Sequence, residues 1–263
     1  MQAFPIIYVR GYAGTGWDVE DTVDDPFCGF NVGSTHVRVG YKGAAQFFGF
    51  ESPLVRLITD PSLRYTDAYN NGFQELPAHL KDDRKQRTIW VYRYYDPTSK
   101  NFEGEIPVRL TIEMAAKGLA EFIAEVKSVT KARQVHLIAH SMGGLICRSL
   151  IQKHYPEQHE RAEDHIAKLF TYGTPHGGIH FDLLLGGLIE KARDFVGWHN
   201  SDDFGPKRMY EYLTASPEKR SREKFDSLSL QGKFPPGRVF CLIGTNSRDY
   251  RVALGASRGA VGV

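Results

Sequence analysis

The chain lacks the features that mark several classes of protein. It has only three cysteines among 263 residues, too few for a disulfide scaffold, and their odd number leaves one thiol without an intrachain partner. No apolar run reaches the roughly 18 to 20 residues that cross a bilayer, and the purest, residues 181–189, is much too short. The formal net charge is only +2, whereas nucleic-acid binding needs a concentrated excess of Lys and Arg. We therefore expect neither a membrane span nor a nucleic-acid partner.

The amino-terminal residues are not expected to form a secretory signal. The amino-terminal residues carry no positive flank, no long apolar segment and no cleavage site. Cys147 lies in an apolar helical pattern and Cys241 in an apolar strand pattern, so both are predicted to be buried rather than reactive thiols. These features favour a cytoplasmic, reducing compartment, although a mature sequence without its leader would look the same.

Apolar, β-branched runs alternate with helical patterns along the chain. Strands are predicted at residues 4–9, 88–95, 134–139, 165–172 and 238–244. Between the second and third of these, apolar residues recur at three-and-four spacing from Ile112 to Val126, which predicts an amphipathic helix. A further helix is predicted to begin at Gly143. The alternation is typical of an α/β fold with a mostly parallel sheet and helices on both faces, and we expect a single domain over residues 1–263.

Two segments fit no strand–helix alternation. Residues from about 17 to 79 are rich in Gly, Asp, Asn and aromatic side chains, and residues from about 199 to 236 are polar with several prolines. Long irregular insertions in an α/β domain usually cover the active site. Both segments are therefore predicted to act as a cap or lid.

The segment that carries the chemistry is Ala139-His140-Ser141-Met142-Gly143, which joins a predicted strand to a predicted helix. A serine at so abrupt a turn is strained, and the residues two before and two after it must be small for the chain to fold tightly. Ala139 and Gly143 meet that need. The turn would lift the Ser141 hydroxyl above the carboxyl edge of the sheet and direct the Met142 N–H toward a bound acyl oxygen. Ser141 is thus predicted to be a nucleophile; the alternative is a serine that only caps the helix.

On these residues the chain resembles the α/β-hydrolases of the bacterial lipase/esterase group, including triacylglycerol lipases and GPI-deacylase-like hydrolases with an Ala-His-Ser-Met-Gly elbow. A second match is the strand and glycine loop of residues 6–14. The family commonly has His-Gly-X-X-Gly there, and Arg10 stands in place of the histidine. The resemblance implies an oxyanion hole formed by the backbone N–H groups of Tyr12 and Met142.

A third match is Tyr-Gly-Thr-Pro-His-Gly-Gly at residues 172–178, which is typical of these lipases at the mouth of the site. Its histidine, His176, follows the wrong strand for the base of the family. His176 is therefore predicted to be structural or to line the pocket.

The other members of the catalytic triad are harder to find. In this fold the acid and then the histidine follow the serine, on loops after the final strands. Asp249 follows the last predicted strand and could be the acid, but no histidine lies beyond that strand. Two hypotheses stay open. Either the chain ends short of its acid and histidine, and so lacks the C-terminal strand and helix of the fold, or an unusual triad recruits His199 or His176.

The sequence thus predicts a serine hydrolase that cleaves carboxylic esters through an acyl-enzyme on Ser141, with no metal or organic cofactor. Aromatic residues in the first insertion suggest an apolar acyl pocket, and hence a small-molecule or lipid ester as substrate, with interfacial contact as one mode of access. A thioesterase or amidase on the same scaffold is an alternative, and so is an inactive hydrolase fold that only binds. Nothing in the sequence indicates the oligomeric state.

Overall fold

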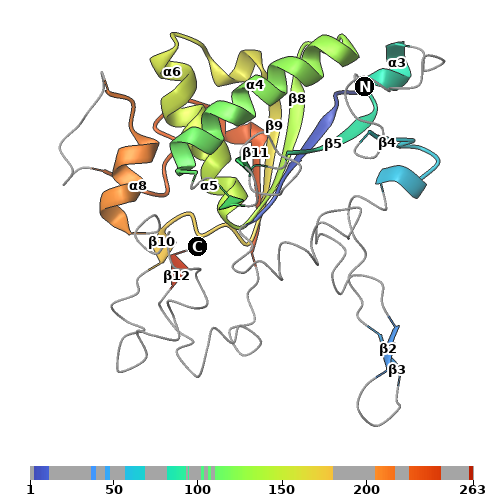
Figure 1. Ribbon diagram of the computed structural model, residues 1–263, viewed down its shortest axis with the longest axis horizontal. Coiled ribbons are helices and arrows are strands. Elements are labelled where there is room, and N and C mark those ends of the chain that lie inside the picture. The colour runs from blue at the N-terminus through green and yellow to red at the C-terminus, as the bar shows by residue number, and fades with distance from the viewer. Residues whose placement is uncertain are drawn as a thin grey trace.

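A parallel β-sheet of six strands runs through the described part of the molecule (Figure 1). The computed structural model describes residues 3–11, 37–39, 45–47, 57–68, 82–92, 94, 102–103, 106–107, 110–179, 205–216, 225–243 and 261–262. The strand order is β11-β9-β8-β1-β5-β4, and every neighbouring pair is parallel. The strands are β1 (Ile6–Val9), β4 (Thr66–Asp67), β5 (Thr88–Tyr92), β8 (Val135–His140), β9 (Ile166–Tyr172) and β11 (Val239–Leu242).

The five predicted strands are confirmed as β1, β5, β8, β9 and β11, with small differences at their ends. The sixth strand, β4, lies in the segment of residues 17–79 that was predicted to be irregular. It pairs Thr66 with Thr88 and Asp67 with Ile89. Two residues are too few to show the alternation by which a strand is recognised in a sequence, and this explains the difference.

Three short antiparallel pairs complete the described strands. They are β2 (Val37–Val39) with β3 (Ala45–Phe47), β6 (Phe102–Glu103) with β7 (Ile106–Pro107), and β10 (Gly178–Ile179) with β12 (Val261–Gly262). The first pair also belongs to residues 17–79. That segment therefore contains more regular structure than its composition indicated.

The strand order reverses between β1 and β8. From β1 the chain goes to β4 and β5 on one side of the sheet, and it later crosses to β8, β9 and β11 on the other. In open α/β sheets the helices on either side of such a reversal diverge, so that a crevice opens at the carboxyl ends of the two strands. The segments that leave β1 and β8 therefore meet at the place where ligands bind in folds of this class.

The helix predicted between the second and third strands is confirmed as α4 (Ile112–Thr130). The Thr111 hydroxyl accepts a hydrogen bond from the Met114 N–H at 3.2 Å and caps its first turn. Lys131, with φ 56°, ends it in the left-handed conformation. The Tyr92 hydroxyl of β5 donates to the Ala115 carbonyl at 2.8 Å, so the helix is fixed to the sheet by a buried polar contact as well as by its apolar stripe.

The second predicted helix is α5 (Met142–Ser149), which continues without a break into the π-helical turn η1 (Leu150–His154) and the short α6 (Tyr155–Glu157). Every residue of α5 is buried. Other short helices in the described residues include α3 (Asp82–Lys85), η2 (Ala162–Asp164) and η7 (Pro236–Arg238). Ser141, the residue directly before the buried helix α5, is partly exposed at the carboxyl end of β8.

One helix, α8 (Pro206–Leu213), lies in the segment of residues 199–236 that was predicted to be a cap or lid. Its residues Met209, Tyr212 and Leu213 are completely buried and belong to the same core cluster as α4 and α5. The polar composition of the segment concealed these three apolar positions. This part of the segment is therefore packed into the body of the protein.

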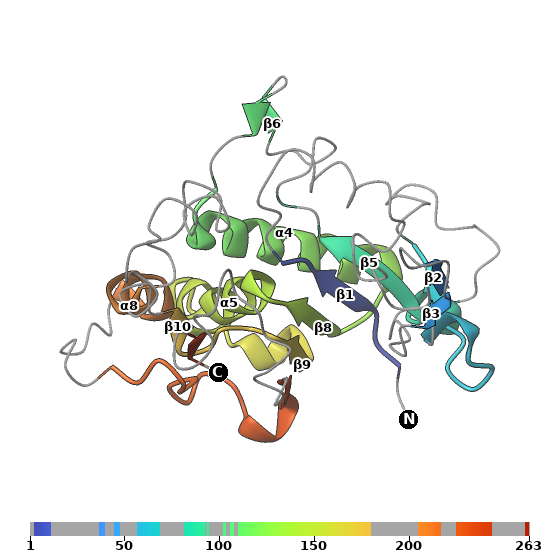
Figure 2. The same ribbon diagram turned by 90° about the horizontal axis from the view of Figure 1, so that it is seen from below.

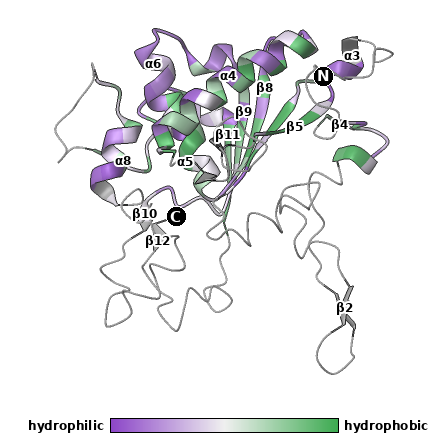
Figure 3. Ribbon diagram, in the orientation of Figure 1, coloured by the Kyte–Doolittle hydropathy of each residue, from purple (hydrophilic) through white to green (hydrophobic). Residues whose placement is uncertain are grey.

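The main core lies on one face of the sheet, under α4, α5 and α8 (Figures 1 and 2). The sheet contributes alternate residues to it, among them Ile7, Val9 and Leu137. The intervening residues Ile6 and Tyr8 form a smaller cluster on the opposite face, with residues of β5 and of segment 57–65. Helices were expected on both faces, whereas the longer described helices all pack on the first. Figure 3 shows the corresponding concentration of hydrophobic residues on β5, β8 and α5.

Among the described helices, none combines the length and the hydropathy that crossing a lipid bilayer requires.

The burial of α8 predicts a large difference between two alanine substitutions on the same helix. Leu213→Ala removes a completely buried side chain and should lower the free energy of unfolding by about 2 to 5 kcal/mol, because the cavity left behind is only partly refilled. Lys207→Ala, at an exposed position, is the matched control and should change it by less than about 0.5 kcal/mol. Urea unfolding measures both. Equal stabilities would mean that α8 does not pack in the core.

Candidate active site

Ser141 occupies a strained turn between β8 and α5. Its backbone has φ 50° and ψ −124°, a conformation that residues other than glycine rarely adopt and that costs on the order of 1 to 3 kcal/mol. The Ser141 N–H donates to the Tyr172 carbonyl at 2.9 Å, and the Ser141 carbonyl accepts from the Gly144 N–H at 3.0 Å. The side chain makes no capping hydrogen bond to the helix. The hydroxyl is thus not serving as a helix cap, which was the alternative to a nucleophile.

Close approach of the backbone explains the small residues of the turn. A Cβ atom on Gly143 would collide with the carbonyl oxygens of Val9 and Arg10, at the end of β1. Ala139, two residues before the serine, is completely buried. The first turn of α5 therefore lies directly against the end of β1, and this contact holds the chain in its abrupt change of direction.

The segment that leaves β1 also borders the serine. A Cβ atom on Gly11 would lie 3.0 Å from the Ser141 Cβ and 2.7 Å from Nδ1 of His140. The Met142 N–H is the first of α5, one of the helix-terminal donors without an acceptor in their own helix. Tyr12, the other predicted oxyanion donor, lies outside the described residues, but its neighbour Gly11 is in contact with the elbow.

The loop after β9 follows the first two turns of α5. Tyr172 accepts the hydrogen bond from Ser141, and the buried Thr174 packs against Gly144 so closely that a Cβ there would overlap its side chain. The His176 carbonyl accepts from Nη1 of Arg148 at 2.9 Å. The third sequence match thus lies beside the elbow, as expected for a segment at the mouth of the site.

The ring of His176 is directed into the sheet. Its Nε2 lies 3.1 Å from the Thr171 hydroxyl and 3.6 Å from Sγ of Cys241. Burial, together with the positive charge of Arg148, lowers the pKa of His176 to about 4, so that the imidazole is neutral at physiological pH. These contacts agree with the prediction that His176 is structural. His199 and Asp249, the other candidates for base and acid, lie outside the described residues.

The two cysteines of the described residues differ in their exposure to solvent. Cys147 is completely buried in α5, and burial raises the pKa of its thiol. Cys241 is exposed, so the prediction that it is buried is wrong. Cys241 lies on β11, which is paired with β9 alone among the described strands and is therefore open on one side. An apolar strand pattern shows that a residue lies in a sheet, but not whether that strand lies at its edge.

Arg148 and Gln152 are functional candidates that sequence reasoning missed. Both are buried polar residues, Arg148 in α5 and Gln152 in the π-helical turn η1 that continues it. Two polar side chains one turn apart on a buried helix were the signal available in the sequence, because such groups are buried only when they are hydrogen-bonded.

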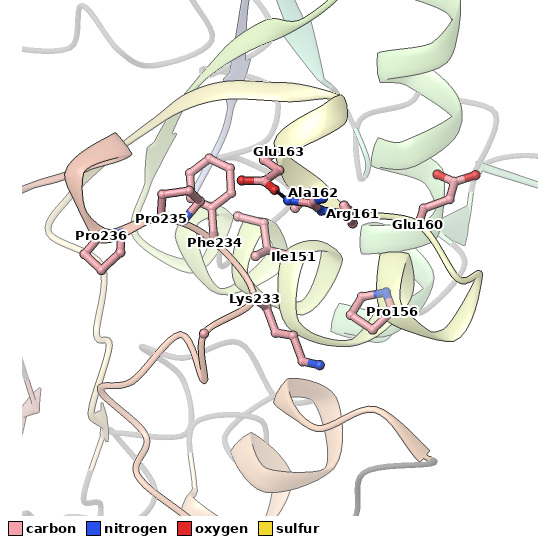
Figure 4. A pocket seen from close by; sticks show the side chains of 11 residues that line it. Ile151, Pro156, Glu160, Arg161, Ala162, Glu163, Lys233, Phe234, Pro235 and Pro236 are labelled. Carbon is pink, nitrogen blue, oxygen red and sulfur yellow. Dashed lines mark ion pairs between the residues drawn. The ribbon is translucent and has the colours of Figure 1, made fainter.

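A cavity of about 540 Å³ lies elsewhere in the molecule, between the turn at Phe234–Pro236 and the side chains of Ile151 and Pro156 (Figure 4). Ala162 and Glu163, which also line it, directly precede β9. It therefore lies at the amino ends of the parallel strands, whereas Ser141 lies at a carboxyl end, so it is separate from the candidate active site. No cluster of metal-ligating side chains was found among the described residues.

The contact between Gly143 and β1 predicts that Gly143→Ala is destabilising. Helix propensity alone would favour alanine by about 1 kcal/mol, but the added methyl group meets two fixed carbonyl oxygens, and overpacking of this kind costs about 1 to 3 kcal/mol. Gly237→Ala is the matched control, because a Cβ there meets no atom. Thermal unfolding compares the two variants, and a stabilised Gly143→Ala protein would contradict the described packing of the elbow.

The neutral histidines predict a loss of stability in mild acid. Burial lowers the pKa of His176 to about 4, and burial with the charge of Lys168 does the same for His136, against about 6.5 in the unfolded chain. Between these values the unfolded chain binds more protons than the folded one, so the free energy of unfolding should decrease as the pH falls from about 6.5 to about 4. Urea unfolding at a series of pH values measures this. In the double variant with His136→Gln and His176→Gln, the free energy of unfolding should change less with pH over this range than in the wild type. Parallel wild-type and variant profiles would refute the assignment.

Comparison with solved structures finds a lipase, a phospholipase and a further bacterial gene product. The lipase BlEst2 of Bacillus licheniformis in its mature form is 14% identical, with 80% of this chain and 58% of that chain covered and a TM-score of 0.38. The phospholipase PlaB of Legionella pneumophila is 12% identical, with 98% and 42% covered and a TM-score of 0.47. The product of the lin2722 gene of Listeria innocua is 15% identical, with 92% and 84% covered and a TM-score of 0.36. The chain therefore spans only about half the length of the first two of these structures.

No sequence of a curated protein matches the chain. A family model does match: the one described as palmitoyl protein thioesterase covers residues 67–205, which include β5, α4, the Ser141 elbow and β9. This agrees with the α/β-hydrolase fold and with the resemblance predicted from the elbow. Since the match extends over slightly more than half of the sequence, the chain belongs to the palmitoyl protein thioesterase family.

Proposed function

We propose that the protein is a serine hydrolase that cleaves carboxylic esters through an acyl-enzyme on Ser141. The observation that carries this proposal is the backbone of Ser141, which is held at φ 50° beside the end of β1. Strain of this kind persists only where the surrounding structure over-determines it, and it is concentrated at functional sites. The turn lies where the strand order reverses, which is the ligand-binding edge of such sheets.

In the proposed mechanism the Ser141 hydroxyl attacks the acyl carbonyl carbon. A histidine has to accept the proton of the hydroxyl as this bond forms. The backbone N–H groups of Met142 and Tyr12 stabilise the resulting oxyanion, which collapses as the bond to the leaving alcohol or thiol breaks and the histidine gives that group its proton. Water, which loses a proton to the same histidine, then attacks the acyl-enzyme and releases the acid and the free Ser141 hydroxyl. His176 is poorly placed for this, since its Nε2 is engaged by Thr171 and Cys241. His199 with Asp249 remains the pair available from the sequence. No cofactor enters the mechanism.

The chemical class of the acyl bond has two candidates. Carboxylic esters of lipids or small molecules follow from the resemblance of the elbow to lipases. Thioesters are favoured by the family to which the chain belongs. Both reactions use the same acyl-enzyme and differ only in the leaving group, so kcat/KM for an oxygen ester and a thioester of one fatty acid decides between them.

Covalent labelling tests the nucleophile. The complete gene product is treated with an alkyl fluorophosphonate, which reacts with activated serines, and the adduct is located by mass spectrometry. We expect one adduct, at Ser141. In Ser141→Ala the adduct should be absent and the esterase activity should fall by at least about 10³-fold. Ser149→Ala is the matched control, since Ser149 is a buried serine on the same helix, and it should retain both. If the folded protein takes no label, it is a binding protein with a hydrolase fold.

A further inference from the structure

Arg148 is a buried cation whose hydrogen bonds to the described residues go to neutral groups. Its side chain is 1% exposed. Nε donates to Oε1 of Gln152 at 3.0 Å, Nη1 to the His176 carbonyl at 2.9 Å, and Nη2 to the Ser229 carbonyl at 3.2 Å. No carboxylate of the described residues forms an ion pair with it. Burial lowers the pKa of Arg148 to about 10, which still leaves the guanidinium charged at neutral pH.

Gln152 completes the arrangement. Its Nε2 donates to the Ser229 carbonyl at 3.1 Å, so that the same carbonyl is held by both side chains. Two residues of one helix thus bind two separate loops. A buried charge costs several kcal/mol of desolvation, and well-packed apolar residues would often stabilise a fold equally well. This cost suggests that the guanidinium is retained for the geometry that it imposes.

The end of β9 and the loop after it are attached to the elbow and its helix at three points. Tyr172, the last residue of β9, binds Ser141 through its carbonyl, Thr174 packs on Gly144, and His176 binds Arg148 through its carbonyl. Alternate residues from Tyr172 to His176 therefore meet successive turns that begin at the proposed nucleophile. The first two contacts are a backbone hydrogen bond and a packing contact, and the third depends wholly on one side chain.

The segment that the third contact holds lies between two glycines with positive φ. Gly173 and Gly178 have φ of 52° and 86°, left-handed conformations in which glycine is not strained. Without Arg148, this segment would keep the packing of Thr174 and the contacts of the His176 ring with Thr171 and Cys241. It would lose the hydrogen bond that joins its backbone to α5 at the His176 carbonyl.

We propose that Arg148 is a positioning residue for hydrolysis, which holds the loop of residues 173–178 as a rigid wall beside Ser141. This inference rests on the function proposed above. A wall of this kind orients a long acyl chain, so that the carbonyl reaches Ser141 in the correct position. A short acyl group makes little contact with it. Misplacement of a substrate by about 1 Å can reduce the rate by about 10²-fold, so the effect should depend on chain length.

The test compares the acetyl and palmitoyl esters of p-nitrophenol with the complete gene product. Arg148→Met should lower kcat/KM for the palmitoyl ester by about tenfold or more and for the acetyl ester by no more than about threefold. Arg148→Lys, which keeps the charge but cannot form all three hydrogen bonds, should fall between. Arg161→Met is the matched control at an exposed arginine near the amino end of β9, away from Ser141, and should match the wild type for both esters.

Loss of folding is separated from loss of positioning by the choice of readout. A general loss of folded protein lowers turnover of both esters equally, whereas the proposed role changes their ratio. If Arg148→Met does not fold, Gln152→Leu removes one hydrogen bond of Arg148 while its charge remains, and the same change of ratio is expected. If a folded variant has the same ratio of palmitoyl-ester to acetyl-ester turnover as the wild type, and fluorophosphonate labels Ser141 in the wild type, then the role of Arg148 is overturned and the proposed function stands. A wild type that takes no label overturns the proposed function, and this inference with it.

Discussion

The packing of the first turn of α5 against the end of β1 is the contact on which the rest of the site depends. Gly143 lies so close to the Val9 and Arg10 carbonyls that no larger residue fits without displacement. Because the helix begins there, the preceding residue has to turn from an extended strand into a helix within a single step. The strained φ of Ser141 is the consequence, and the buried surroundings of α5 maintain it.

The position of this turn follows from the order in which the chain places its strands in the sheet. The chain occupies one side of β1 with β4 and β5 and the other with β8, β9 and β11. The loops after β1 and β8 therefore leave neighbouring strands at the same edge, and Gly11 and Ser141 come into contact although they are far apart in the sequence. The strand order thus brings the segment that leaves β1 beside the Ser141 turn.

Buried polar groups then attach the outer loops to this framework. Arg148 and Gln152 hold the His176 and Ser229 carbonyls, so a segment after β9 and one before β11 are fixed to the elbow helix. Backbone carbonyls in loops are costly to bury without a donor. The guanidinium supplies donors in three directions at once, which a neutral side chain cannot do. Apolar packing sets the position of α5, and this polar network sets the position of the loops relative to it.

The sequence predicted those parts of the fold that depend on local pattern. Strand alternation, the spacing of apolar residues in α4 and the small residues around Ser141 are each visible within a few neighbouring positions, and the structure confirms the elements that they predicted. Other features depend on contacts between distant segments. The two residues of β4 form a strand only because β5 lies beside them, and α8 is buried only because α5 presents a surface to it.

The same distinction applies to the candidate site. The choice of Ser141 came from the sequence, because a strand, a tight turn and a helix are consecutive there. The exposure of Cys241, the orientation of His176 and the partners of Arg148 were decided by the tertiary structure. Each depends on which strand lies at the sheet edge or which loop passes a buried charge. Local sequence determines the conformation of a segment, whereas burial and hydrogen-bond partners are properties of the assembled chain.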